Sequence, residues 1–195
     1  MTVSIITRSL DKQTANAAYL GVCPDIVRTC AVPPGQYRHL VSSDPLTAGN
    51  ELHALLGRMN DHNALSPTEK AYLPWIDAFR TAVRSLGVSK MDAEFALSSV
   101  GCVPGGVCDL LVRGGPQKRG VVEVKVLLHG TQEQPRGRDL AQLGSYARLI
   151  AGGGSFDHVW GAVAYIELDS HLVRIYGFKN ARKLVTQTLE LLRAA

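Results

Sequence analysis

The stretch GVCDLLVRGGPQKRGVVEVKVLL, residues 106–128, decides the fold. Two aliphatic runs, 106–113 and 120–128, flank a Gly-Gly-Pro turn, which is typical of a β-hairpin. Glu123 and Lys125 lie two apart in the second run, so their side chains share one face of the strand. Charged residues inside such a run are costly unless they are paired or bind something. The sequence therefore predicts buried strands with one functional face.

Asp109 lies in the first strand of this hairpin and can be placed beside Glu123 by strand pairing. Two carboxylates that meet in this way form a hard-oxygen site suited to Mg²⁺ or Mn²⁺. The alternative is that Glu123 and Lys125 form an ordinary solvated charge pair, which is what most Glu-x-Lys pairs on strands are. The spacing alone leaves both interpretations open.

Hydrophobic periodicity outside the hairpin predicts helices before it and a helix, two strands and a final helix after it. Helix starts are indicated at 42–45 and 66–69, and a glycine ends the second helix at Gly87. The remaining predicted elements are strands over 93–99, 158–167 and 171–178 and helices over 138–154 and 179–195. This order favours an α/β fold in which a central mixed β-sheet is flanked by helices.

Residues 44–195 are predicted to form this domain, whereas residues 1–43 are poorly patterned. We interpret 1–43 as an N-terminal extension, either part of the same domain or irregular, with one short helix. The net charge of +4 is compatible with a nucleic-acid ligand but does not establish one. There is no secretory signal and no apolar stretch of membrane-spanning length, so we expect a soluble, cytoplasmic protein with reduced thiols.

Four short motifs together resemble a known family. Residues 106–109, 123–125 and 142–146 are similar to the GxxD, ExK and QxxxY elements of the PD-(D/E)XK nuclease superfamily. The last element points to the branch that includes RecB-like and lambda-exonuclease-like nucleases. Residues 49–56 are similar to the Gly-x-x-x-His-x-x-Leu helix of the RecB-like group. The motifs follow the order of the family and span about half of the chain.

The resemblance implies a three-layer restriction-endonuclease-like fold and a metal-dependent active site. Asp109 and Glu123 would bind Mg²⁺ or Mn²⁺, with the Val124 carbonyl and His53 as further ligands. Lys125 would position the attacking water and stabilise charge on the phosphate. The number of metal ions is not determined by the sequence.

Gln142 and Tyr146 lie four apart and share one face of the predicted helix. Within the resemblance they act at the active site and on the DNA backbone, although Tyr146 alone would be read as a core aromatic. Arg136 and Arg138, near the start of this helix, are candidates for holding a phosphate or are simply solvated.

Three further residues are weaker candidates. Glu51 is a rival metal ligand to His53, since many family members use a glutamate from this helix. Glu94 matches a glutamate that is common in RecB-like domains and would be supporting or structural. His129 could touch the substrate or be solvated. All four cysteines precede Tyr146, so no iron–sulfur cluster is expected.

The expected function is that of a metal-dependent deoxyribonuclease, most simply an exonuclease in DNA recombination, repair or phage DNA processing. The alternatives are a non-catalytic nucleic-acid-binding module with the same fold, or a structure- or site-specific endonuclease. The expected partner is DNA, single- or double-stranded, and a homo-oligomer or a recombination partner protein is left open. Strand polarity, exo versus endo action and a preference for DNA over RNA are not determined.

Overall fold

The computed structural model describes residues 12–33, 35, 38–58, 65–152 and 154–194, which form a mixed six-stranded sheet with helices on both faces. Its strands are β1 (Ile26–Ala31), β2 (Val88–Leu97), β3 (Gly106–Gly114), β4 (Arg119–Leu127), β5 (Val159–Glu167) and β6 (Leu172–Phe178). Its helices are α2 (Lys12–Ala18), α3 (Pro45–Gly57), α4 (Pro67–Ala71), α5 (Leu73–Arg84), α6 (Gly137–Ala151) and α7 (Arg182–Ala194), with short 3-10 turns at Arg38–Leu40 and Phe156–His158.

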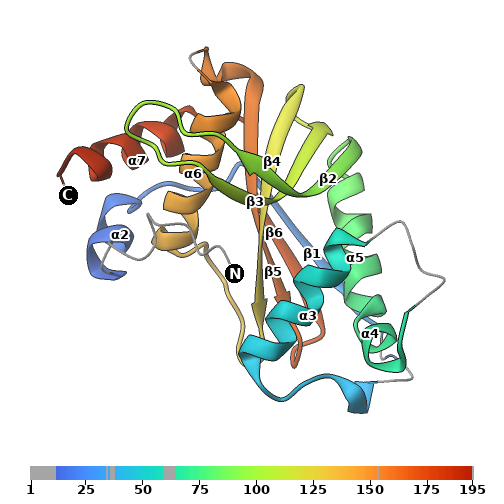
Figure 1. Cartoon of the computed structure of the whole chain (residues 1–195). Coiled ribbons are helices and arrows are strands. Elements are labelled where there is room, and N and C mark those ends of the chain that lie inside the picture. Colours follow the sequence, from blue (N-terminus) through green and yellow to red (C-terminus); the bar gives the residue numbers. More distant parts are fainter. Residues whose placement is uncertain (1–11, 34, 36–37, 59–64, 153, 195) are drawn as a thin grey trace.

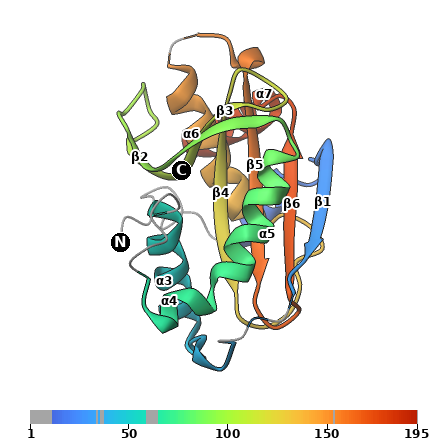
Figure 2. The ribbon, with the colours of Figure 1, turned by 90° about the vertical axis from the view of Figure 1, so that its right-hand side faces the viewer.

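The strand order is β1-β6-β5-β4-β3-β2, and Figure 2 looks onto the sheet with β1 at one edge and β2 at the other. Four of the neighbouring pairs are antiparallel. Short connections join the strands of three of them, β2 to β3, β3 to β4 and β5 to β6, whereas β1 and β6 pair although they are far apart in the sequence. Only β4 and β5 run parallel, because helix α6 crosses between them. The predicted central mixed sheet is confirmed.

The helices divide between the two faces of the sheet, which gives three layers (Figure 1). Helices α3, α4 and α5 cover one face and enclose a core that includes Trp75, Phe79 and Trp160. Helices α2, α6 and α7 cover the other face, where Leu143 and Tyr146 are buried. This confirms the predicted α/β class. No helix among the described residues is both long enough and apolar enough to cross a bilayer.

Capping residues fix the starts of α3 and α4. Asp44 accepts a hydrogen bond from the Thr47 amide, and Ser66 and Glu69 form a reciprocal capping box. The helix predicted after Ser66 is divided at Tyr72 into α4 and α5, because proline follows Leu73 and cannot extend an earlier helix. Strand β2 starts at Val88, five residues before the predicted start at residue 93.

The predicted N-terminal extension contributes to the same sheet. Helix α2 packs against α6, and β1 pairs antiparallel with β6 as an edge strand. No strand was predicted there, because Ile26–Ala31 is short, mostly exposed and flanked by prolines. Residues 1–11 of the extension lie outside the described residues.

Close approach to its neighbours fixes α6 over the sheet. A Cβ atom on Gly144 would lie 2.2 Å from Thr188 Oγ1 of α7, so only glycine permits this helix crossing. A Cβ atom on Gly137 would lie 2.3 Å from the Ala15 carbonyl oxygen of α2. These contacts hold the helix that carries Gln142 and Tyr146 at a defined height above β4 and β5.

Candidate active site

The candidate site lies where β3 parts from β4. The two strands pair from Leu110↔Val122 to Arg113↔Arg119, and their pairing ends before Asp109. The Val124 amide instead donates a hydrogen bond of 2.7 Å to Asp109 Oδ2. The carboxylate thus takes the place of a carbonyl of the neighbouring strand, so the side chain is fixed by the sheet itself.

Glu123 is buried, with 1% of its surface exposed, and faces α6 from the middle of β4. Its Oε1 accepts a hydrogen bond of 2.6 Å from Lys125 Nζ. Its Oε2 is buried and has no hydrogen-bond partner within the described part of the chain. Burial, and then the charge of Asp109, raise the pKa of Glu123 to about 8. A buried carboxylate oxygen without a donor is costly to keep and marks a place for a positively charged or donating ligand.

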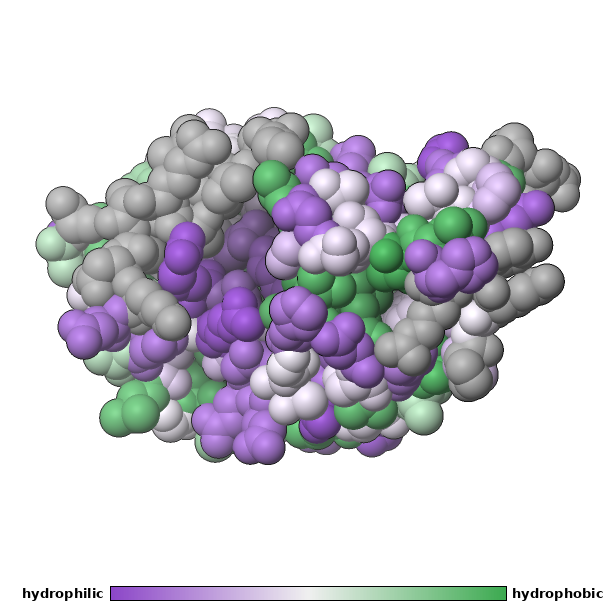
Figure 3. Space-filling view, turned by 90° about the horizontal axis from the view of Figure 1, so that it is seen from below, coloured by the Kyte–Doolittle hydropathy of each residue, from purple (hydrophilic) through white to green (hydrophobic). Residues whose placement is uncertain are grey.

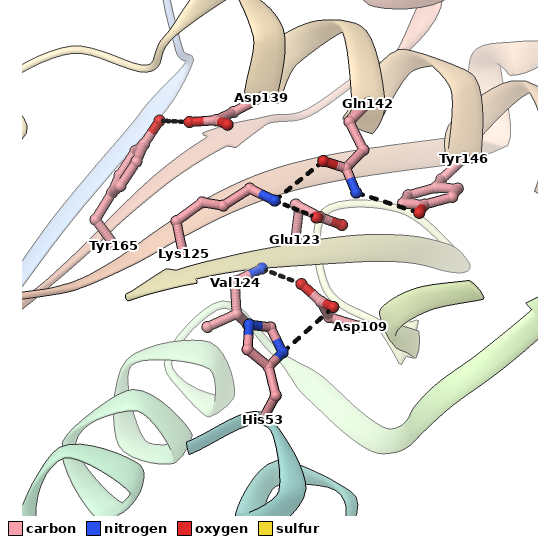
Figure 4. Close-up of polar contacts among 9 residues, drawn as sticks. All are labelled: His53, Asp109, Glu123, Val124, Lys125, Asp139, Gln142, Tyr146 and Tyr165. Carbon is pink, nitrogen blue, oxygen red and sulfur yellow. Dashed lines mark hydrogen bonds and ion pairs between the residues drawn. The ribbon is translucent and has the colours of Figure 1, made fainter. Parts of the chain in front are cut away.

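Asp109 contacts His53 beside Val124 of β4 (Figure 4). Helix α3 brings His53 Nδ1 to 3.4 Å from Asp109 Oδ1. Burial lowers the pKa of His53, and the charge of Glu123 opposes that effect, so the imidazole is neutral near pH 7. Burial raises the pKa of Asp109, against the charge of Lys125. A neutral imidazole beside a carboxylate is a pair that can bind a divalent metal.

Lys125 lies between Glu123 and the helix above it (Figure 4). Its Nζ donates to Gln142 Oε1 at 3.0 Å as well as to Glu123. Burial alone would lower the pKa of Lys125, but the charges of Glu123 and Asp109 outweigh it and raise the pKa. The raised pKa favours the charged ammonium form, and two acceptors hold this group in place.

Gln142 and Tyr146 complete the face of α6 that lies over the site. Gln142 Nε2 donates to the Tyr146 hydroxyl at 3.2 Å, while its Oε1 accepts from Lys125. The Tyr146 ring lies so close to β3 that a Cβ atom on Gly106 would be 3.3 Å from it. The structure thus brings Lys125, Gln142 and Tyr146 into one chain of hydrogen bonds, as the shared helix face predicts.

A second polar group beside Lys125 was not predicted. The Tyr165 hydroxyl donates to Asp139 Oδ2 at 2.6 Å and accepts from the Arg136 amide at 3.0 Å. The charge of Asp139 contributes to the raised pKa of Lys125. Asp139 lies three residues before Gln142, so the periodicity of the helix carries a signal for its position. Nothing in the local sequence indicates Tyr165 as its partner.

The three weaker candidate residues differ in their surroundings. Glu51, the predicted rival ligand, accepts a hydrogen bond of 2.7 Å from the Tyr72 hydroxyl. His129 lies on the surface, 2.6 Å from Asp169 Oδ2. Glu94 is exposed but close enough for its charge to act on His53 and Asp109, so it lies at the rim of the site.

A groove of about 1080 Å³ opens beside the site, and both Lys125 and Gln142 line it. Arg136 and Arg138, the predicted phosphate contacts, also line it and are exposed at the start of α6. Seen from below, the molecule is hollowed on the side of α2 and α6, with hydrophilic residues in the hollow (Figure 3). The candidate site can therefore be reached from this side.

The residues at the site fit a hard divalent cation by their chemistry. Asp109 and Glu123 supply carboxylate oxygens, one of them buried without a donor, and His53 supplies a neutral nitrogen. A cation would also offset the repulsion that contributes to the raised pKa of Glu123. Within the described residues, however, no three or more His, Cys, Asp or Glu side chains are arranged so that they could hold a metal as they stand. The Val124 amide, rather than its carbonyl, makes the backbone contact to Asp109.

Comparisons with known proteins give no family. No protein-family model matches the chain, and no curated protein matches it. A solved structure described as "Crystal structure of SSO0001" is similar over 77% of this chain and 78% of that chain, with 18% identity and a TM-score of 0.34. This similarity is too weak to carry any argument about function.

Proposed function

We propose that this protein is a metal-dependent nuclease that hydrolyses phosphodiester bonds of DNA, most simply as an exonuclease. The observation that carries the proposal is the unsatisfied, buried Oε2 of Glu123, which lies next to Asp109 and beneath a fixed lysine. Elsewhere in a fold, such an oxygen would be paired or replaced. Its presence here supports a ligand-binding role for the carboxylates.

Asp109, Glu123 and His53 would hold a Mg²⁺ or Mn²⁺ ion, with the Val124 carbonyl as a further ligand expected from the family resemblance. When bound, the ion would supply Lewis-acid polarisation of the phosphoryl group and a lower pKa for the attacking water.

The protein's own groups have separate roles in this proposal. Lys125 presents a permanent positive charge to the phosphate and stabilises the negative charge that develops on it. Gln142 fixes the Lys125 ammonium by accepting a hydrogen bond from it, and the Tyr146 hydroxyl fixes the Gln142 amide by accepting a hydrogen bond in turn. Neutral His53 holds Asp109 in place from α3. These contacts preorganise the charged groups before the substrate arrives.

The test is to incubate the purified protein with end-labelled linear duplex, single-stranded DNA and covalently closed circles. Each substrate is combined with Mg²⁺, Mn²⁺ or EDTA. The proposal expects metal-dependent cleavage that Lys125→Ala abolishes and that Lys183→Ala, at an exposed lysine on α7, leaves unchanged.

The substrates separate the alternatives. Sparing of circles would support an exonuclease, and cleavage of circles would support an endonuclease. Binding of DNA without cleavage in either metal would contradict the proposal and support a non-catalytic binding module.

A further inference from the structure

The groove beside Lys125 has two walls of different chemistry. One wall is polar and is formed by the loop before α6 and by the start of that helix, including Arg136 and Arg138. The other wall is formed by residues 20–27, where Leu20, Val22 and Val27 present apolar side chains. A ligand that fits both walls needs negative charge on one side and apolar surface on the other.

The exposure of the apolar wall is unusual for its residue types. Leu20 is 86% exposed and Val27 is 51% exposed, although both are large aliphatic side chains. Scattered exposed aliphatics are common, but these two face the same groove together with Val22 and Pro24. Their clustering beside the candidate site indicates a surface that is covered when a ligand binds.

The polar wall is suited to phosphate groups. Helix α6 has fifteen residues, and its N-terminus, where the positive end of the helix dipole lies, opens on the groove at Arg138, whereas the Gly137 amide is already bonded to Asn16. Arg136 is held in place because its Nε donates to Gln132 Oε1 at 2.9 Å, and its guanidinium lies over the Tyr165 ring. Glu133 and Asp139 also line the groove, so the positive charge is local to the arginines rather than spread over the wall.

Both walls are preformed. The Gln132 amide donates to the buried carboxylate of Glu167 at 2.8 Å, and Tyr176 donates to the Gln132 carbonyl at 2.5 Å. These bonds fix the loop of the polar wall to the sheet. Asn16 of α2 accepts a hydrogen bond of 3.0 Å from the Gly137 amide, which ties the segment before the apolar wall to the start of α6. These hydrogen bonds therefore fix the polar wall of the groove relative to the sheet and to α2.

We propose that the groove guides an unpaired DNA strand to Lys125, with phosphates along Arg136 and Arg138 and bases against Leu20, Val22 and Val27. This inference rests on the nuclease function proposed above and names the form of its substrate. A duplex keeps the faces of its bases stacked inside, so an apolar wall would meet only sugar and phosphate. A single strand exposes its base faces, and aliphatic side chains can cover these apolar faces without reading the sequence.

The decisive experiment measures binding in EDTA, so that cleavage plays no part. A fluorescein-labelled oligodeoxythymidine strand and a duplex of equal length are titrated with the full chain and with the double variant Leu20→Gln/Val27→Thr. Both substitutions are neutral and at exposed positions, and Leu46→Gln, at a leucine that is 63% exposed on α3, is the matched control. Thermal unfolding midpoints confirm that all variants are folded.

The double variant is expected to bind the single strand about tenfold more weakly, with less than a twofold change for the duplex. Leu46→Gln is expected to bind both as the unaltered protein does. An unchanged single-strand affinity in the double variant, an equal loss for the duplex, or no single-strand binding by the unaltered protein would overturn the groove proposal.

A second measurement does not depend on substitutions. A strand containing 4-thiothymidine is crosslinked to the unaltered protein by light, and the attached peptides are identified by mass spectrometry. Crosslinks are expected within residues 20–27, and crosslinks confined to other segments would contradict the proposal. If the strand binds in the groove but neither metal supports cleavage, the nuclease function fails while the groove stands. If the protein cleaves DNA but the double variant binds the single strand as tightly as the unaltered protein, the nuclease function stands and the groove proposal fails.

Discussion

Two buried glutamates on neighbouring parallel strands have opposite surroundings. Glu167, at the end of β5, has a hydrogen-bond donor on each oxygen: the Gln132 amide on Oε1 and the Ser170 hydroxyl on Oε2, both at 2.8 Å. Arg174 Nε also lies 3.1 Å from Oε1 and forms an ion pair with it. Glu123, in the middle of β4, has Lys125 on one oxygen and no donor from the described residues on the other. Both side chains are almost fully buried.

The difference teaches that burial of a charge does not by itself identify a functional site. Glu167 is satisfied by its surroundings and connects the loop of the groove to the sheet, which is a structural role. Glu123 is left incomplete by the protein alone, and its pKa is raised because burial and Asp109 both disfavour its charged form. We therefore expect changes at Glu167 to affect stability and changes at Glu123 to affect activity.

The largest expected effect is on folding. Glu167→Ala removes the ion-pair partner of the partly buried Arg174 and leaves the Gln132 amide without its acceptor. We expect the free energy of unfolding to fall by about 3–5 kcal/mol, as measured by urea denaturation. Glu190→Ala, at an exposed position on α7, is the control and should change it by less than about 0.5 kcal/mol. A small loss for Glu167→Ala would mean that the two glutamates do not differ as described.

Glu123→Gln should lower activity and leave stability nearly unchanged. The amide keeps the shape of the side chain and removes a charge that burial disfavours, so unfolding in EDTA should be unchanged within about 1 kcal/mol or slightly harder. Metal-dependent cleavage should fall by about 10²–10³-fold, because the electrostatic centre of the site is lost. Full cleavage by this variant, measured at saturating Mg²⁺, would remove Glu123 from the proposed mechanism.

Divalent metal should test the role of Glu123 through thermal stability alone. A ligand that binds only the folded state at 100 times its dissociation constant stabilises it by about 2.7 kcal/mol. We expect Mg²⁺ or Mn²⁺ to raise the thermal midpoint of the unaltered protein and to have little effect on Glu123→Gln. KCl at equal ionic strength is the control. An equal shift in both proteins would place the metal away from Glu123.

The smallest expected effect is at the outer end of the hydrogen-bond chain. Tyr146→Phe removes the hydroxyl that accepts from Gln142, which should lower the free energy of unfolding by about 0.5–1.5 kcal/mol and cleavage by up to about tenfold. Tyr72→Phe removes a comparable hydroxyl that contacts Glu51 and should cost similar stability. Its cleavage rate should stay unchanged. If both variants lose activity equally, the effect of Tyr146 is one of folding.

The central part of the molecule was predictable because its signals are local. The hairpin around Gly114 and Gly115, the charged residues at alternate positions of β4 and the four-residue spacing on α6 all follow from periodicity and turn residues. The fold class follows from the order of these elements.

The parts that were missed depend on contacts between distant segments. β1 has only six residues, and its partner β6 lies at the other end of the chain, so local sequence gives little evidence for it. The same holds for Tyr165, which reaches Asp139 from a different strand, and for Glu167, whose donors come from a loop and from β6. The contact of Asp109 with the Val124 amide depends on where β3 leaves β4, and no residue type signals that point.

The pairing of β1 with β6 has a consequence for the order of assembly. The hairpin, α6 and β5 form a unit of neighbours in sequence, whereas β1 must wait for the strand that is synthesised last among the six. Contacts between residues so far apart in the sequence form slowly, since the intervening chain must first be ordered. The carboxylates and Lys125 therefore take their places early, and the strand that carries Val27 closes the sheet only after β6 has emerged.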